Sequence, residues 1–198
     1  MKTVLPTCLM LVCISLIGLS CDKKQDQKST IQANKQNSGL DKMKAWYVLS
    51  SSSAGFEILM PTEPKKQQKK EDTDNGLVTT TAYLSIKDNA AYSVVVTNMP
   101  LRVANGIDPE KEFDDTVKKL QKKISGTILK QKSEEMNGNK SMTFSMSGTG
   151  PFGKTLYRVK LLRVGQNTIQ LMTAHPMSED MASDALRFFN SFKLEQTP

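Results

Sequence analysis

The sequence predicts an α+β protein in which an antiparallel β-sheet is covered by two helices. Short runs of alternating apolar and polar residues, separated by turn residues, predict strands joined as hairpins. Two stretches with helical spacing of apolar residues interrupt these runs. The composition, 38% hydrophobic and 24% charged over 198 residues, is that of an ordinary soluble globular protein with one domain after a leader.

Residues 1–20 are predicted to form a signal peptide. Lys2 supplies the positive start, and the segment from Val4 to Leu19 is predominantly apolar. A stable transmembrane helix needs about 20 predominantly apolar residues, and this stretch is shorter and ends at polar residues. We therefore expect the leader to direct export.

Cys21 is predicted to carry a lipid anchor. The run Ile17-Gly18-Leu19-Ser20-Cys21 resembles a bacterial lipobox, in which the cysteine is acylated and becomes the new N-terminus, although Gly18 stands where Leu is usual. Gly18 and Ser20 also fit ordinary signal peptidase, so simple secretion is the alternative. Residues 21–43 are predicted to be a disordered polar tether. The protein is thus expected to be a palmitoylated lipoprotein on the periplasmic or extracytoplasmic face of the envelope.

Residues 44–198 are predicted to form a single folded domain that begins with four strands. Ala82, Leu84 and Ile86 alternate on the inner face of the third strand, which is expected to form a hairpin with the fourth across Lys87-Asp88-Asn89. The charged segment before the third strand is expected to be a loop. The four predicted strands are Trp46–Leu49, Phe56–Met60, Val78–Ile86 and Ala91–Thr97.

A helix is predicted to follow the fourth strand. Asp108 is a favourable N-cap, and Pro109 fits the first helical position. The apolar residues that follow recur with helical spacing and predict one buried stripe. They are Phe113, Val117, Leu120 and Ile124.

Four more strands and a last helix are predicted in the second half of the domain. Asn137-Gly138 is a strong hairpin signal between the first two of these strands. Ser178 is expected to cap the last helix, whose apolar face would consist of Ala182, Ala185, Leu186 and Phe189. The predicted strands are Ile128–Met136, Lys140–Met146, Leu156–Val164 and Thr168–Ala174.

Three segments resemble PsbP-like bacterial lipoproteins, including those called DcrB-like. These segments are Gly55-Phe56-Glu57-Ile58-Leu59-Met60-Pro61, the Asp108-Pro109 helix start and the terminal Phe188-Phe189-Asn190-Ser191-Phe192-Lys193-Leu194. The family shares a fold group with the extrinsic photosystem subunit and a Ran-binding nuclear import factor. The resemblance implies an αβα sandwich with a central antiparallel sheet, no common catalytic residue, and a role in binding other proteins.

Counting residues excludes several kinds of site. The cysteines are Cys8, Cys13 and Cys21, all at or before the end of the leader, and His175 is the only histidine. We therefore expect the folded domain to have no disulfide, no thiolate metal site, no cysteine nucleophile and no histidine-based catalytic triad. We expect no catalytic, cofactor or metal site, and a domain that folds as a monomer.

Two features are candidates for contact with a partner or a membrane surface. The first is the basic run with Lys65, Lys66, Lys69 and Lys70, for which a solvated loop balanced by nearby acids is the alternative. No aromatic residue is interleaved with these lysines, which argues against nucleic acid. The second is Phe152, expected either at an exposed loop tip or folded back over the core.

Phe152 lies within Gly148-Thr149-Gly150-Pro151-Phe152-Gly153, which has the letters of the dinucleotide fingerprint. That fingerprint requires a helix directly after the glycines, and here a strand is predicted. A hairpin loop is therefore expected.

The leading functional hypothesis is a non-catalytic, lipid-anchored envelope protein that binds another protein as an accessory or assembly factor. The alternative is a small-ligand or lipid-binding module with an apolar pocket lined by Met142, Phe144, Met146 and Met172. A hydrolase ranks third, because no pair of acids has a spacing that suggests catalysis.

Overall fold

The computed structural model describes residues 46–177 and 182–195. The predicted signal peptide, Cys21 and the predicted tether lie outside these residues, as does Ser178. Within them, no helix combines the length and the apolar character needed to cross a membrane.

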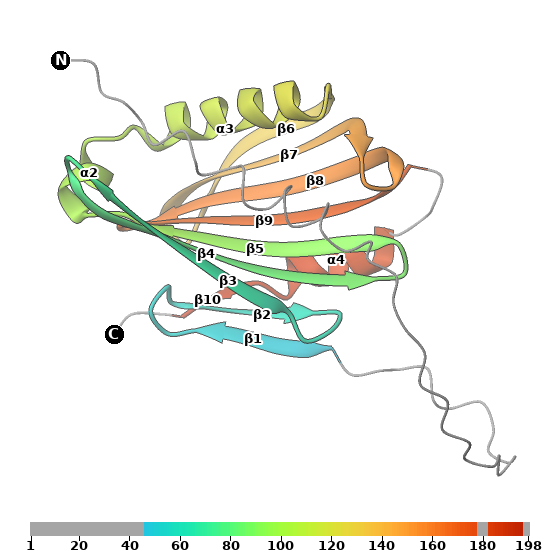
Figure 1. Cartoon of the computed structure of the whole chain (residues 1–198), viewed down its shortest axis with the longest axis horizontal. Helices are drawn as coiled ribbons and strands as arrows, with labels where there is room; N and C mark the ends of the chain where they lie inside the picture. The colour runs from blue at the N-terminus through green and yellow to red at the C-terminus, as the bar shows by residue number, and fades with distance from the viewer. Residues whose placement is uncertain (1–45, 178–181, 196–198) are drawn as a thin grey trace, which may run out of the picture.

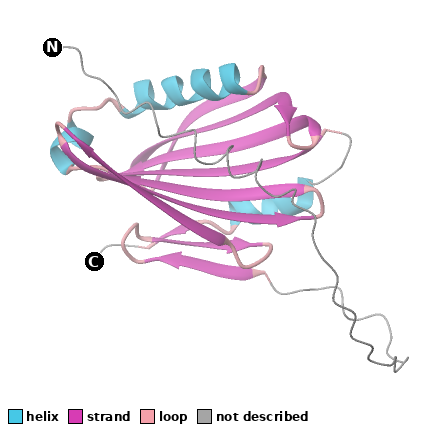
Figure 2. Ribbon diagram, in the orientation of Figure 1, coloured by secondary structure: helices cyan, strands magenta, loops and turns pink. Residues whose placement is uncertain are grey.

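The larger of two sheets has seven strands, all antiparallel, in the order β3-β4-β5-β9-β8-β7-β6 (Figures 1 and 2). The pairing of β5 with β9 joins the two halves of the chain, and the other neighbours are successive hairpins. Strands β3 and β6 therefore form the two edges. The strands are β3 Lys65–Thr73, β4 Gly76–Lys87, β5 Ala90–Asn98, β6 Thr127–Met136, β7 Asn139–Gly150, β8 Gly153–Val164 and β9 Asn167–Pro176.

A second, smaller sheet packs against one face of the larger one (Figure 1). Its strands are β1 Tyr47–Ser51, β2 Phe56–Met60 and β10 Lys193–Leu194, in the order β1-β2-β10. Phe56, Ile58 and Met60 alternate along β2 and are fully buried. Helix α4, Ala182–Asn190, completes this layer through Phe188. The prediction of one sheet thus differs from the structure, in which the first two predicted strands belong to a separate sheet.

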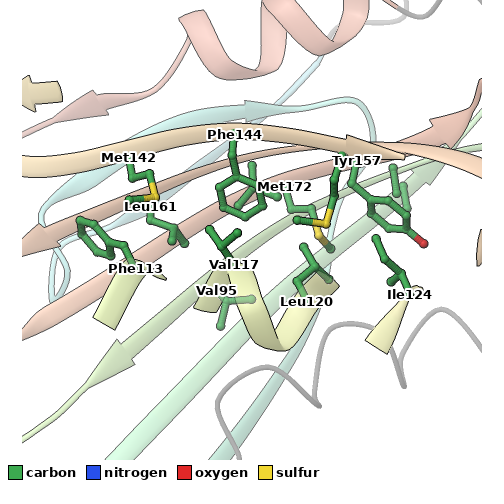
Figure 3. Packing of buried hydrophobic residues seen from close by; sticks show 14 of the residues in the cluster. Val95, Phe113, Val117, Leu120, Ile124, Met142, Phe144, Tyr157, Leu161 and Met172 are labelled. Carbon is green, nitrogen blue, oxygen red and sulfur yellow. The ribbon is translucent and has the colours of Figure 1, made fainter. Parts of the chain in front are cut away.

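Helix α3, Pro109–Lys123, covers the opposite face of the larger sheet (Figure 1). As predicted, Asp108 is its N-cap, and the side chain accepts a hydrogen bond of 3.0 Å from the Glu110 backbone N–H. The predicted apolar stripe is buried in the core beneath the helix (Figure 3). A short helix before it, α2 Leu101–Asn105, was not predicted and buries Ala104 against Val78 and Met99.

Asp108→Ala should lower the free energy of unfolding by about 1 kcal/mol, because the first turn of α3 loses its capping acceptor. Urea denaturation of the wild type and the variant measures this difference. Asp115→Ala is the control, since it removes the same charge from the same helix outside the capping position. Equal losses for both variants would contradict the role of the cap.

Three details of the sequence-based prediction are wrong. The segment expected as a charged loop contains β3, which pairs along its whole length with β4. Ile86 and Leu186 were expected to face inward, but they are 45% and 56% exposed. Ile86 lies near the end of its strand beside the turn. On α4, Ala185 is buried as predicted, whereas Phe188 takes the inward position that was expected for Leu186.

Candidate functional site

A polar hollow of about 370 Å³ lies between the β1–β2 turn and the larger sheet. It is lined by residues from β3, β4 and β5, from the β8–β9 turn with the start of β9, and from the end of β1 with the following turn. The lining residues are Ser51, Ser53, Ala54, Lys66, Gln68, Thr79, Thr81, Tyr83, Val96, Asn98, Gln166 and Asn167. We call this site the polar hollow.

The register of the larger sheet brings these side chains together. Lys66 lies opposite Tyr83 on the β3–β4 pair, and Asn98 lies opposite Asn167 on the β5–β9 pair. Alternate residues of a strand share a face, so these residues continue the face that carries Val94 and Ile169 beneath the small sheet. The hollow is the polar margin of that face, at the β1–β2 turn.

The hydrogen bonds among the lining side chains use only part of their donors and acceptors. Gln68 Nε2 donates to Thr81 Oγ1 at 3.1 Å, and Asn98 Nδ2 donates to Asn167 Oδ1 at 2.8 Å. These bonds leave the Thr81 hydroxyl hydrogen, the Asn98 carbonyl and the Asn167 amide hydrogens available. The Lys66 ammonium lies 5.7 Å from the centroid of the Tyr83 ring. No carboxylate lines the hollow, so its side chains carry one formal positive charge.

The four lysines named as candidate contacts lie on the edge strand β3. Lys66 and Lys70 share the face of the hollow, whereas Lys65 and Lys69 share the opposite face. Lys69 forms an ion pair with Glu71. In the part of the chain that the structure describes, no carboxylate forms an ion pair with Lys65, Lys66 or Lys70.

The other edge strand of the larger sheet, β6, carries two lysines and two glutamates, so its formal charges cancel. On β6, Lys132 lies 3.4 Å from Glu134, which also lies 3.7 Å from Lys160 of β8. Glu135 lies 3.3 Å from Lys140 of β7. The two edges therefore differ in the positive charge that they offer to another molecule.

Phe152 does not join the lysines in one surface. It lies in the turn between β7 and β8, half-buried against the core beneath α3. Three strands, β4, β5 and β9, separate β8 from β3 in the sheet. The glycine-rich string around Phe152 is followed by a strand, so the helix that phosphate binding needs is missing there. Gly150 is explained by packing, because a Cβ atom there would collide with the Tyr157 hydroxyl.

His175 lies on β9 with its side chain packed inside the protein. Its ring is buried, with Nδ1 2.9 Å from the Pro176 carbonyl oxygen. Because a carbonyl only accepts, Nδ1 carries the hydrogen and Nε2 is left without a partner. Within residues 46–177 and 182–195, no cluster of three histidine, cysteine, aspartate or glutamate residues is arranged to hold a metal ion.

A buried ion pair between α3 and the sheet was missed by sequence reasoning. The Glu112 carboxylate pairs with Arg163 Nη2 and accepts a hydrogen bond of 3.0 Å from Thr168 Oγ1. Arg163 Nη1 lies 3.7 Å from the Met99 sulfur. The sequence did contain a signal for this ion pair. Arg163 follows Leu161 at the spacing of two residues that places side chains on the same buried face of β8, and a buried arginine needs an anionic partner.

Burial raises the pKa of Tyr92 to about 12 from its ordinary value of 10.0, and the negative charges of Asp184 and Asp88 act in the same direction. The folded protein then keeps a proton that the unfolded chain loses, so the free energy of unfolding should fall as pH rises from about 10 to about 12. Tyr92→Phe should reduce this alkaline loss.

At neutral pH the same variant should unfold with nearly the wild-type free energy, because the buried Tyr92 hydroxyl has no hydrogen-bond partner. Urea denaturation of both proteins at about pH 8 and about pH 11 checks the two expectations. An identical alkaline loss in the wild type and Tyr92→Phe would contradict the assignment to Tyr92.

No protein-family model matches the chain, and no curated protein matches it. Among solved structures, the chain is similar to cyanobacterial PsbP (CyanoP) from Synechocystis sp. PCC 6803, with a TM-score of 0.52 and 12% identity over 80% of this chain and 98% of that one. It also matches PA94 from Pseudomonas aeruginosa, a protein of unknown function, with a TM-score of 0.38 and 8% identity over 77% of this chain and 98% of that one. The second likeness carries no weight for the fold. The first shows that this chain has a PsbP-like α+β fold.

Proposed function

We propose that this chain is a non-catalytic, lipid-anchored protein of the cell envelope that binds another protein as an accessory or assembly factor. The observation that carries the proposal is the edge strand β3, on which Lys65, Lys66 and Lys70 have no acidic partner among the described residues. Cys21 anchors the chain through acylation, and residues 21–43 hold the domain clear of the lipid headgroups.

Strand β3 suits an acidic, extended segment of a partner. Its nine residues extend over roughly 30 Å, and it pairs with β4 alone among the described strands. An added strand would gain main-chain hydrogen bonds along the free edge, and lysines on both faces would favour acidic side chains on both faces of that strand.

The same lysines disfavour pairing between two copies of this chain. In an antiparallel pair of two β3 strands centred between Gln67 and Gln68, Lys65 would face Lys70 and Lys66 would face Lys69, and like charges directly across a strand pair are destabilising. This register of self-pairing is thus disfavoured, whereas an acidic partner strand would meet no such repulsion.

The alternative of an apolar ligand pocket is less favoured. Met142, Phe144, Met146 and Met172, which were expected to line it, pack against α3 and are at most 4% exposed (Figure 3). A hydrolase is also less favoured, because the acids Asp108 and Glu134 have structural contacts: Asp108 caps α3 and Glu134 pairs with lysines.

The experiment is quantitative crosslinking in native membranes with the full chain. The variant Lys65→Gln, Lys66→Gln, Lys70→Gln should lose most of the partner adducts that the wild type forms, because its edge no longer attracts acidic groups. The matched control changes Lys111, Lys118 and Lys122 on the exposed side of α3 to Gln, which removes the same charge. Equal adduct yields for both variants would overturn the proposal, as would binding of the wild-type edge to anionic lipid vesicles without any protein adduct.

Cys21→Ser should move the protein from the membrane fraction to the soluble fraction, because acyl chains supply the proposed anchor. Cell fractionation with immunodetection measures the shift, and metabolic labelling with a fatty acid measures acylation. Cys13→Ser, within the leader, is the control and should leave both readouts unchanged. An exported wild-type protein that takes up no label would contradict the anchor and leave ordinary secretion.

A further inference from the structure

We propose that the polar hollow binds a hydroxyl-rich small molecule that carries one carboxylate, of the class of a uronic acid sugar. This inference concerns a second site and rests on the hollow alone, not on the proposed binding of a partner at the edge of β3. Three properties of the hollow lead to it: its charge, its unused hydrogen-bonding groups and its shape.

The charge of the hollow selects an anion with a single negative group. Lys66 is the only charged residue in the lining, and no acid there or in a described ion pair neutralises it. Its ammonium lies over the Tyr83 ring, which holds the positive charge at the wall of the hollow. A carboxylate is a natural partner for one ammonium, because a charge-assisted hydrogen bond is stronger than a neutral one.

The hydrogen-bonding groups select hydroxyls for the rest of the ligand. Asn98 and Asn167 share one side-chain hydrogen bond of 2.8 Å, which leaves the Asn98 carbonyl oxygen as an acceptor and the Asn167 amide as a donor. Gln68 and Thr81 likewise share one hydrogen bond, of 3.1 Å, which leaves the Thr81 hydroxyl hydrogen available as a donor. A sugar hydroxyl both donates and accepts, so it can use a neighbouring donor and acceptor together.

The polar surface of the hollow disfavours a lipid chain as its ligand. A volume of about 370 Å³ lies within the range of small-molecule sites and has room for a sugar ring with its substituents. Tyr83 and Val96 provide a limited apolar surface for the C–H groups of such a ring. An alkyl chain would leave the amide and hydroxyl groups without partners, which costs free energy.

The lining is also preorganised. Most of its side chains project from paired strands of one sheet, whose register fixes their spacing before any ligand arrives. Fewer side chains then need to be ordered on binding, which lowers the entropic cost. Ser51 and Ser53 of the β1 end and turn close the opposite side, with their hydroxyl oxygens 3.4 Å apart.

Saturation-transfer NMR on the full chain in detergent micelles tests the inference with D-glucuronate, D-glucose and acetate as probes. Glucuronate should bind, and glucose and acetate should each bind at least about tenfold more weakly. Glucose lacks the carboxylate that pairs with Lys66, and acetate lacks the hydroxyls that pair with the amide and hydroxyl groups. Binding of acetate as strong as that of glucuronate would overturn recognition of the hydroxyls. Binding of glucose as strong as that of glucuronate would overturn the role of charge.

Two neighbouring lysines provide the matched variants. Lys66→Gln should weaken glucuronate binding by about tenfold, whereas Lys65→Gln, on the opposite face of the same strand, should leave it unchanged. Circular dichroism should be the same for both variants. Equal effects of the two changes, or displacement of glucuronate by an acidic peptide with the same dependence on Lys66, would overturn a dedicated small-molecule site. Partner adducts that are absent from the wild type, together with retained glucuronate binding, would overturn only the proposal for the edge of β3.

Discussion

Glu112→Ala is expected to lower the free energy of unfolding by about 3–5 kcal/mol, the loss typical of a broken buried ion pair. Glu112 and Arg163 are both more than nine-tenths buried, and the carboxylate also accepts the Thr168 hydroxyl hydrogen bond. Without the carboxylate, the Arg163 guanidinium would keep its charge in the protein interior with no anionic partner among the described residues. Urea denaturation followed by circular dichroism measures the loss.

Two further variants distinguish loss of the pair from loss of a charge on α3. Glu110→Ala removes an exposed acid that lies 3.5 Å from Lys140, and it should cost at most about 1 kcal/mol. Changing Glu112 to Met and Arg163 to Leu together should restore most of the stability, because an apolar pair leaves no buried charge. A double variant as unstable as Glu112→Ala would contradict this explanation.

Phe144→Ala is expected to lower the free energy of unfolding by about 3–5 kcal/mol through loss of apolar contacts and formation of a cavity. The ring projects from β7 into the core beneath α3, among Val117, Leu161 and Met172 (Figure 3). Thermal and urea denaturation measure the change. The core, unlike the edge of β3, is thus expected to govern stability.

Phe152→Ala is the control for Phe144→Ala, because it removes the same ring from a half-buried position at the border of the same core. Its cost should be clearly smaller, since the transfer and cavity contributions both scale with burial. Similar losses at the two positions would contradict the placement of Phe152. A normal partner yield for folded Phe152→Ala is expected, because Phe152 lies far from β3 in the strand order.

Elements with their own apolar pattern were predicted well from the sequence. Helix α3 combines a capping residue, Asp108, with a buried stripe, and the β6–β7 hairpin turns at Asn137-Gly138. Strand β3 has no such pattern, because an edge strand is held by the backbone hydrogen bonds of one neighbour and its lysines remain in solvent. A search for alternating apolar and polar residues therefore does not detect β3 or its pairing with β4.

The polar hollow could not be predicted from local patterns. Its main side chains, Lys66, Tyr83, Asn98 and Asn167, come from four strands, and only the sheet register places them side by side. None of these four residues lies in a sequence motif that indicates a binding site. The lysines of β3 were identified as candidates, but the difference between them and the compensated charges of β6 depends on pairings that only the structure supplies.

Site-specific photo-crosslinking in native membranes tests most directly the claim that β3 binds a partner protein. A photoreactive residue is placed at Gln67 on β3 or at Ser133 on β6, two exposed positions on opposite edges of the larger sheet. We expect a discrete adduct from position 67 that disappears when Lys65, Lys66 and Lys70 are changed to Gln, and no such adduct from position 133. Adducts of equal yield from both edges, or an adduct from position 67 that does not depend on the lysines, would contradict it.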